Sequence, residues 1–133
     1  MPDAVTDTHG LVWYLEDDSR LGSAARAAFE ACDRGEIAIY VPTICLVEIV
    51  YLQEKGRIAP TLKSLFDAVL QSGATRLVPT NLTVEIVDSL NRVSRTDIPD
   101  MPDRIIVATA LHLGLPLISR DSKIQVTSVQ TIW

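Results

Sequence analysis

Cysteine and long apolar runs are scarce in this sequence. The two cysteines, Cys32 and Cys45, do not form a C-x-x-C pair, so neither a disulfide framework nor a cysteine-ligated zinc site is indicated. No run approaches the ~18 apolar residues of a membrane-spanning helix. The N-terminus, MPDAVTDTHG, lacks the basic start and the apolar stretch of an export signal. We therefore expect a cytoplasmic protein with reduced thiols and no membrane partner.

The chain also lacks a surplus of positive charge. It has 12 Lys and Arg against 17 Asp and Glu, which leaves a net charge of −5. Proteins that bind nucleic acid passively through its phosphates normally carry a basic surplus. An acidic protein can still act on nucleic acid when part of its negative charge holds a cation, because a bound cation inverts the local field.

Strand-like and helix-like segments alternate along the chain. Apolar residues make up 47% of the 133 residues, enough for a buried core, and we predict one domain spanning residues 1–133. The predicted strands are 4–7, 36–41, 75–79, 115–119 and 129–133. The predicted helices are 23–35, 42–56, 60–73, 81–93 (capped by Asn81) and 102–114. Strands separated by helices need crossover connections, which predicts a parallel α/β sheet with ligands at the carboxyl ends of its strands.

Two aspartates lie at or just past the ends of predicted strands. Asp7 comes before the apolar, helix-like run LVWYL, and Asp121 follows the strand-like run LPLIS and Arg120. Each has an ordinary structural interpretation, because aspartate is a good helix N-cap and Arg-Asp-Ser is common in turns. Each also occupies the edge at which a parallel sheet binds its ligands.

Two more carboxylates lie in the first parts of predicted helices. Glu48 interrupts the apolar run ICLVEIVYL, so we expect a helix that is buried on nearly every side. A carboxylate there needs an arginine partner, a solvated stripe or a functional role. In DMPDRIIVATA, Asp100 fits an N-cap and Asp103 the third position of a capping box. Capping accounts for both aspartates but not for the arginine, Arg104, that follows at once.

A bound cation would explain the positions of all four carboxylates together. In a parallel α/β sheet the strand ends and the following helix starts share one edge, so all four carboxylates are expected to converge on one cleft. Clustered carboxylates repel one another unless a cation neutralises them, and oxygen ligands select hard ions such as Mg²⁺ or Mn²⁺. The two histidines, His9 and His112, are isolated in the sequence, and we interpret them as structural or surface residues.

Four short acidic segments occur in a fixed order along almost the whole chain. They are TDTHGLVWYL, VPTICLVEI, DMPDRIIVATAL and LISRD. Together they resemble the PIN domain, and most closely the VapC-type toxins of bacterial type II toxin–antitoxin systems. In DMPDR the proline stands one place later than in the family's common Asp-Pro-Phe-Asp form, and Ser119 replaces the family's threonine. Both aspartates and Arg104 keep their spacing.

The resemblance implies a three-layer α/β/α sandwich with a central parallel sheet of about five strands, and a metal-dependent endoribonuclease. Mg²⁺ or Mn²⁺ would polarise a phosphodiester oxygen and activate a water for in-line attack. The implied ligands and catalytic residues are Asp7, Glu48, Asp103 and Asp121. Weaker expectations are that Asp100 touches the site, that Arg104 orients an acidic ligand and that the Ser119 hydroxyl binds a carboxylate or a metal-bound water. RNA as substrate, a cognate antitoxin and a homodimer follow from the same resemblance.

Other interpretations stay open at this point. Arg95, Arg120 and Lys123 flank the acidic edge, either as contacts for RNA phosphates or as ordinary solvated charges. A haloacid-dehalogenase-type phosphatase also begins with a strand-end aspartate, but it usually has a second acid two residues on, where this chain has His9. A receiver domain needs an adjacent acidic pair. A catalytically inactive interaction module on the PIN fold is the remaining alternative.

Overall fold

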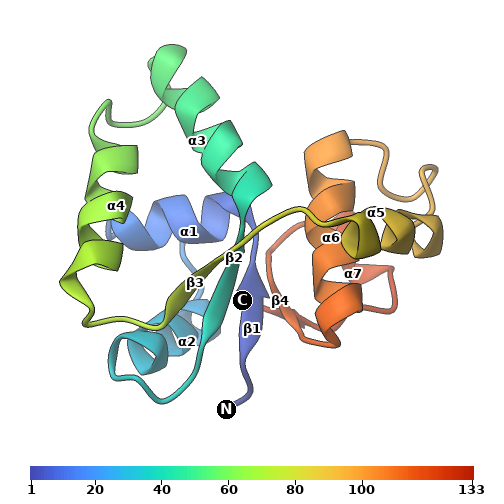
Figure 1. The fold of residues 1–133 in the computed structure, drawn as a ribbon, viewed down its shortest axis with the longest axis horizontal. Helices are drawn as coiled ribbons and strands as arrows, with labels where there is room; N and C mark the ends of the chain where they lie inside the picture. The colour runs from blue at the N-terminus through green and yellow to red at the C-terminus, as the bar shows by residue number, and fades with distance from the viewer.

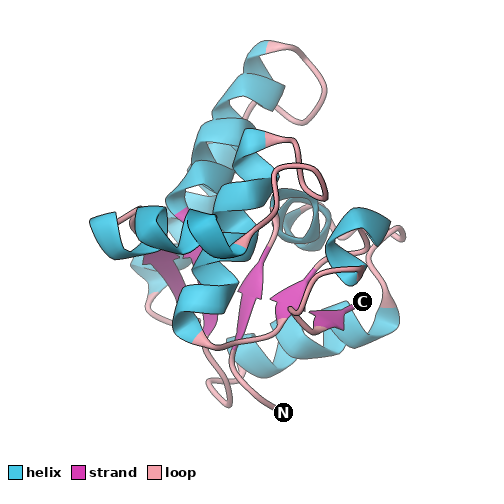
Figure 2. Ribbon diagram, turned by 90° about the vertical axis from the view of Figure 1, so that its right-hand side faces the viewer, coloured by secondary structure: helices cyan, strands magenta, loops and turns pink.

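A five-stranded parallel sheet forms the centre of the protein in a computed structural model, which describes residues 1–133 (Figure 1). The strands lie in the order β3-β2-β1-β4-β5, and each neighbouring pair is parallel (Figure 2). Their bounds are β1 Ala4–Thr6, β2 Ile39–Pro42, β3 Leu77–Thr80, β4 Leu117–Ile118 and β5 Thr131–Ile132. The predicted parallel α/β sheet of about five strands is confirmed.

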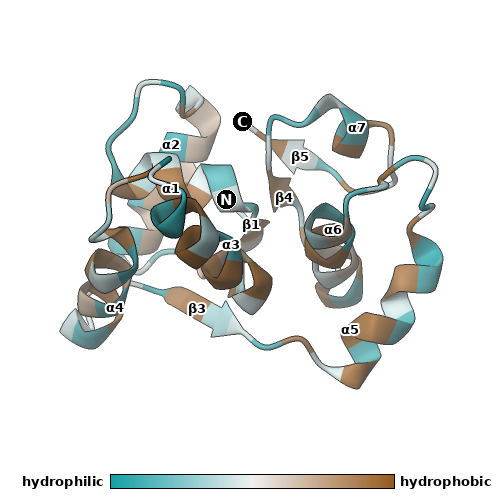
Figure 3. Cartoon of the chain, turned by 90° about the horizontal axis from the view of Figure 1, so that it is seen from above, coloured by the Kyte–Doolittle hydropathy of each residue, from teal (hydrophilic) through white to brown (hydrophobic).

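Helices cover both faces of this sheet. They are α1 Thr8–Leu15, α2 Ser23–Asp33, α3 Thr43–Glu54, α4 Leu62–Ser72, α5 Val84–Ser89, the 3₁₀ helix η1 Leu90–Arg92, α6 Met101–Leu113 and α7 Ser122–Gln125. Helices α1 to α4 lie on one side, and α5 to α7 lie on the other (Figures 1 and 3). The sheet grows from β1 through β2 to β3 and then returns past β1 to β4 and β5. Right-handed crossovers place the helices of the two directions on opposite faces, which gives the expected three layers.

Several predicted boundaries move inward in the structure. The predicted strand at 36–41 pairs only from Ile39, and β4 and β5 pair over two residues each. The helix expected from Asn81 begins at Val84 instead, because the side chain of Thr83 accepts the capping hydrogen bond from the Ile86 N–H. These shifts leave the strand ends, and therefore the polar edge of the sheet, where the sequence predicts them.

The apolar core holds the central strand rigidly. Ala4 and Val5 of β1 are completely buried, as are Phe29 and Phe66 from one helical layer and Ile106 from the other. Full burial of a large apolar side chain contributes about 1.5–3 kcal/mol each. The residues that follow β1 therefore extend from the most firmly packed part of the fold.

Helix α3 is not buried on nearly every side, so that prediction was wrong. Only Cys45 and Ile49 are fully buried on it, whereas Val47 is 46% exposed and Tyr51 is 59% exposed. Figure 1 shows the reason, since α3 runs away from the end of β2 and its later turns pass beyond the sheet. No helix of the protein is both long and apolar enough to cross a membrane.

Candidate functional site

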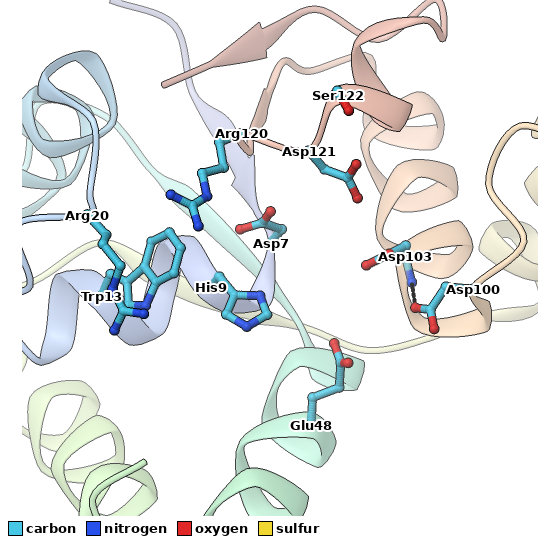
Figure 4. A pocket seen from close by; sticks show the side chains of 10 residues that line it. All are labelled: Asp7, His9, Trp13, Arg20, Glu48, Asp100, Asp103, Arg120, Asp121 and Ser122. Carbon is cyan, nitrogen blue, oxygen red and sulfur yellow. Dashed lines mark hydrogen bonds between the residues drawn. The ribbon is translucent and has the colours of Figure 1, made fainter. Parts of the chain in front are cut away.

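A pocket of about 740 Å³ opens at the carboxyl edge of the sheet (Figure 4). Ten residues line it, and five of them carry carboxylates: Asp7, His9, Trp13, Arg20, Glu48, Asp100, Asp103, Arg120, Asp121 and Ser122. Carboxylates from both helical layers and from two strand ends thus meet in one cavity, as the strand-end rule for parallel sheets predicts.

Neighbouring strands bring Asp7 and Asp121 to the same edge. Strands β1 and β4 are paired, with Thr6 opposite Ile118. Asp7 caps α1, because its Oδ1 accepts a hydrogen bond of 2.8 Å from the Gly10 N–H. Asp121 caps α7 through a 2.9 Å hydrogen bond from the Lys123 N–H to its Oδ1. Asp7 therefore fills its predicted role as a helix N-cap, and Asp121, predicted as a turn residue, caps a short helix instead, while both line the pocket.

The Glu48 side chain reaches the pocket from α3 and is held there by α1. The Thr8 hydroxyl donates a hydrogen bond to Glu48 Oε1. Thr8 is 4% exposed, so this contact lies beneath the pocket rather than in open solvent. Sequence reasoning missed Thr8, although it follows Asp7 directly at the strand end and the same rule would have found it. The hydroxyl restricts the rotamers of Glu48 and keeps its carboxylate at the cavity.

Asp100 and Asp103 enter the pocket from the start of α6. Asp100 Oδ2 accepts a 3.2 Å hydrogen bond from the Asp103 N–H, so the predicted N-cap is present. Burial, and after it the negative charges of the other four pocket carboxylates, Asp100 foremost, together raise the pKa of the Asp103 carboxyl to about 7. Asp103 is thus poised between its protonated and ionised forms at neutral pH.

Burial raises the pKa of two further groups at this edge of the sheet, the Asp7 carboxyl and the Cys45 thiol. Burial raises the pKa of Asp7, while the Gly10 N–H, the Ser119 hydroxyl and His9 favour its ionised form and partly oppose that effect. Burial raises the pKa of the Cys45 thiol far above its usual range, and the nearby carboxylates add to this. Cys45 therefore stays a neutral thiol, and its Sγ lies 3.7 Å from the Thr6 carbonyl oxygen. Both cysteines are free and buried.

The chemistry of these donors fits a hard divalent cation. All five acidic side chains offer oxygen, and none of them takes part in any of the ion pairs of the structure, which join other residues. Their mutual repulsion is visible in the raised pKa of Asp103. No three acidic, histidine or cysteine side chains are close enough together to form a complete ligand set as they stand. Water molecules would complete the coordination of an ion held by one or two of these carboxylates, as is usual for Mg²⁺.

A model of the PIN domain family matches residues 4–129. This chain belongs to the PIN domain family. It is 28% identical over 125 residues to ribonuclease VapC22 of Mycobacterium tuberculosis, a match that covers 94% of this chain and 92% of the relative.

Solved structures show the same fold. One is VapBC2 from Rickettsia felis bound to a DNA fragment from its promoter, with a TM-score of 0.71 at 15% identity over the whole of both chains. Another is a toxin–antitoxin complex from Klebsiella pneumoniae, with a TM-score of 0.64 at 22% identity over 98% of this chain and 96% of the other. At these identities the likeness extends to the fold alone.

Arg104 does not join the acidic pocket of this PIN domain, so the expectation that it orients an acidic ligand was wrong. Its Nη2 donates to the carbonyl oxygens of Leu90 and Val93, both at 2.9 Å, and its Nε donates to Val93 at 3.2 Å. A residue adjacent to Asp103 on a helix is rotated by about 100° around the axis. That rotation aims the guanidinium at the end of η1, where it ties α6 to the preceding segment.

Ser119, the basic residues near the acidic edge and His112 differ in how they relate to the pocket. Ser119 is fully buried, and its Oγ accepts a 3.1 Å hydrogen bond from the Asp121 N–H, so it supports the loop that carries Asp121. Of the three basic residues near the acidic edge, only Arg120 lines the pocket, whereas Arg95 and Lys123 do not. His112 is exposed in the last turn of α6, as a surface residue should be.

Four pocket residues were not foreseen as part of a site: His9, Trp13, Arg20 and Ser122, which follows Asp121 at the start of α7. His9 was interpreted as structural or surface, but it lines the cavity three residues beyond the end of β1. Its place near a strand end is a signal that could have found it. Trp13 and Arg20 also line the cavity, from α1 and from the loop after it. Neither residue adjoins a strand end, and their place in the pocket depends on how α1 and the loop after it pack at the edge of the sheet.

Proposed function

We propose that this PIN domain is a metal-dependent endoribonuclease that hydrolyses phosphodiester bonds of RNA. The observation that carries the proposal is the convergence of five carboxylates, from two strand ends and two helices, on one pocket in which none of them forms an ion pair. The similarity to a relative named as a ribonuclease supports RNA as the substrate class.

Four of the carboxylates would hold the ion: Asp7, Glu48, Asp103 and Asp121. Mg²⁺ or Mn²⁺ bound there would polarise a phosphodiester oxygen and lower the pKa of a coordinated water. The residues of the chain do the rest. Thr8 orients Glu48, and Asp103, whose pKa is about 7 without the ion, would release its proton when the ion binds. Asp100 keeps the first turn of α6 in place through its hydrogen bond to Asp103.

The test is cleavage of defined RNAs by the purified protein with Mg²⁺, with Mn²⁺ and with EDTA. Cleavage should need the ion, and Asp103→Asn should lower kcat by about 100-fold or more, because several kcal/mol of transition-state stabilisation are lost. Asp67→Asn is the matched control, since Asp67 is a half-exposed carboxylate that pairs with Lys63 on α4, outside the pocket. Equal cleavage in EDTA, or by the Asp103→Asn protein, would refute the proposal. RNA binding without any cleavage would favour the inactive interaction module.

We further infer that the protein is the toxin of a cytoplasmic toxin–antitoxin pair, with a cognate antitoxin that blocks the pocket. The named complexes among the solved structures of this fold support that partner class. Expression of the chain should arrest growth of its host, and co-expression with the product of an adjacent small gene should relieve the arrest. Relief without complex formation between the purified proteins would contradict this assignment.

A homodimer is supported by the exposed apolar side chains of α3 and α4. Val47, Val50 and Tyr51 on α3 and Leu65 on α4 are all exposed, and the two helices pack against each other. Apolar surface of this kind is typical of interfaces. Light scattering should give twice the chain mass, and Tyr51→Glu should return the protein to a monomer. A monomeric wild-type protein would overturn this part of the proposal.

A further inference from the structure

One wall of the pocket is basic and aromatic, opposite the carboxylates of α6. Figure 4 shows Trp13, Arg20 and Arg120 gathered on one side, with Asp100 and Asp103 on the other. The guanidinium carbons of Arg20 and Arg120 lie 4.7 and 4.4 Å from the centroid of the Trp13 ring. Two cations thus share one indole, an arrangement that stabilises guanidinium groups near an aromatic face. We refer to Trp13, Arg20 and Arg120 as the arginine wall.

The arginine wall is built from segments that hold one another in place. Trp13 is only 5% exposed, and its ring contacts His9 at 5.4 Å and the C-terminal Trp133 edge-on at 5.7 Å between centroids. Trp133 in turn presses on the loop that carries Arg20. A Cβ added to Gly22 would stand 2.4 Å from the Trp133 carbonyl carbon. The indole therefore presents the two guanidinium groups from a fixed platform rather than from a mobile surface.

The two arginines differ in how their charge is used. Arg20 is engaged by Asp18, whose carboxylate accepts hydrogen bonds from its Nη2 at 2.8 Å and its Nε at 3.1 Å. Arg120 forms no ion pair in the structure, although it follows Ser119 and precedes Asp121 at an acidic edge. A guanidinium without a carboxylate partner retains its planar fork of donors for a phosphate.

A phosphate is the ligand that this wall fits best. The chain has a net charge of −5, and its pocket holds five carboxylates, so a polyanion gains no general attraction to it. RNA that places one phosphate among those carboxylates carries further phosphates on either side. The arginine wall is the only basic part of the pocket besides His9.

We propose that the arginine wall binds a backbone phosphate of single-stranded RNA next to the scissile one, with Arg120 as its main contact. Asp18 orients Arg20, and Trp13 holds both guanidinium groups against its ring at the side of the cavity. The wall thereby sets which phosphodiester lies over the carboxylates. This assignment rests on the proposed ribonuclease function and names how its substrate is held.

The primary test measures RNA binding apart from cleavage. A labelled single-stranded oligonucleotide is titrated by fluorescence anisotropy with Asp103→Asn protein, at a series of salt concentrations. Adding Arg120→Ala should weaken binding about tenfold, as expected for a charge-assisted contact, and should reduce the slope of log K against log salt by about 0.7. Arg120→Lys should recover part of the affinity and the full slope, because it restores the charge without the planar fork.

The matched control is Arg34→Ala, which removes an exposed arginine paired with Glu36 after α2. In cleavage assays on the otherwise native protein, Arg120→Ala should raise KM with little change in kcat, the mark of lost substrate binding.

An RNA affinity and a salt slope equal to those of Arg34→Ala would overturn the proposed role of the arginine wall while leaving the ribonuclease function intact. Loss of antitoxin binding without loss of RNA binding would reassign the wall to the protein partner. A wild type that cleaves no RNA would refute the proposed function, and the binding titration would still decide about Arg120.

Discussion

Asp100 holds the Asp103 backbone in place and at the same time destabilises the ionised form of the Asp103 carboxyl. Asp100 Oδ2 accepts a hydrogen bond of 3.2 Å from the Asp103 N–H. After burial, the negative charge of Asp100 is the largest contribution that raises the pKa of the Asp103 carboxyl to about 7. The same short segment therefore starts a helix and stores electrostatic repulsion that a cation would relieve.

The raised pKa of Asp103 predicts how stability depends on pH without metal. The carboxyl has its usual pKa of 3.8 when unfolded and about 7 when folded, so the folded state binds the proton more tightly. The resulting stabilisation is complete below about pH 4 and is lost as the pH rises through about 7. At pH 8, Asp103→Asn should therefore melt higher than wild type by roughly 2–4 °C, a modest shift because Asp103 is partly exposed to solvent. The gap should close at pH 4–5, and parallel melting curves of the two proteins against pH would contradict this.

A divalent ion should reverse this loss of stability. Saturating Mn²⁺ or Mg²⁺ at about 100 times its Kd should add roughly 2.7 kcal/mol of stability, which calorimetry would detect as a higher Tm. The gain should grow from pH 6 to pH 8, because the ion competes with the proton on Asp103. Glu48→Gln should blunt the gain, whereas Asp67→Asn should not. An equal gain in all three proteins would place the ion elsewhere.

The hydrogen bond from Thr8 to Glu48 predicts a role for a residue outside the acidic set. Thr8→Ala frees the Glu48 carboxylate and should weaken metal affinity about 10- to 100-fold, the usual cost of losing a residue that orients a ligand. Thr8→Ser keeps the hydroxyl and should restore most of the affinity. Isothermal titration with Mn²⁺ measures both. If Thr8→Ser is as weak as Thr8→Ala, the methyl packing of Thr8 matters more than its hydroxyl.

Arg104 should behave as a structural residue. Arg104→Ala leaves the carbonyl oxygens of Leu90 and Val93 without their charged donor, and it should cost about 1.5–3 kcal/mol in the free energy of unfolding. Urea denaturation measures this cost. Metal affinity, measured below the unfolding transition, should match that of wild type. A large loss of metal affinity with unchanged stability would instead return Arg104 to the acidic site.

Local patterns in the sequence were enough to predict the topology of the sheet and most of the acidic residues of the pocket. Alternating strand-like and helix-like runs imply crossovers, and crossovers imply a parallel sheet. Asp7 and Asp121 adjoin strands in the chain itself, so their placement at the carboxyl edge follows from covalent connection. Asp100 and its partner Asp103 lie within one helical turn, and their capping bond follows from that spacing alone.

Only the tertiary structure decides which way a side chain points and which residues, distant in sequence, it contacts. Apolar periodicity reports which side chains avoid water, but not what covers them, and so the exposure of Val47 and Tyr51 on α3 was not foreseen. The direction in which the Arg104 side chain points depends on where η1 packs, because its guanidinium donates to the Leu90 carbonyl oxygen there. The arginine wall joins Trp13 to Arg120 and to Trp133, which are distant in sequence. Such contacts arise only when the chain closes on itself, because no local spacing encodes which distant segment will share an indole or a pocket.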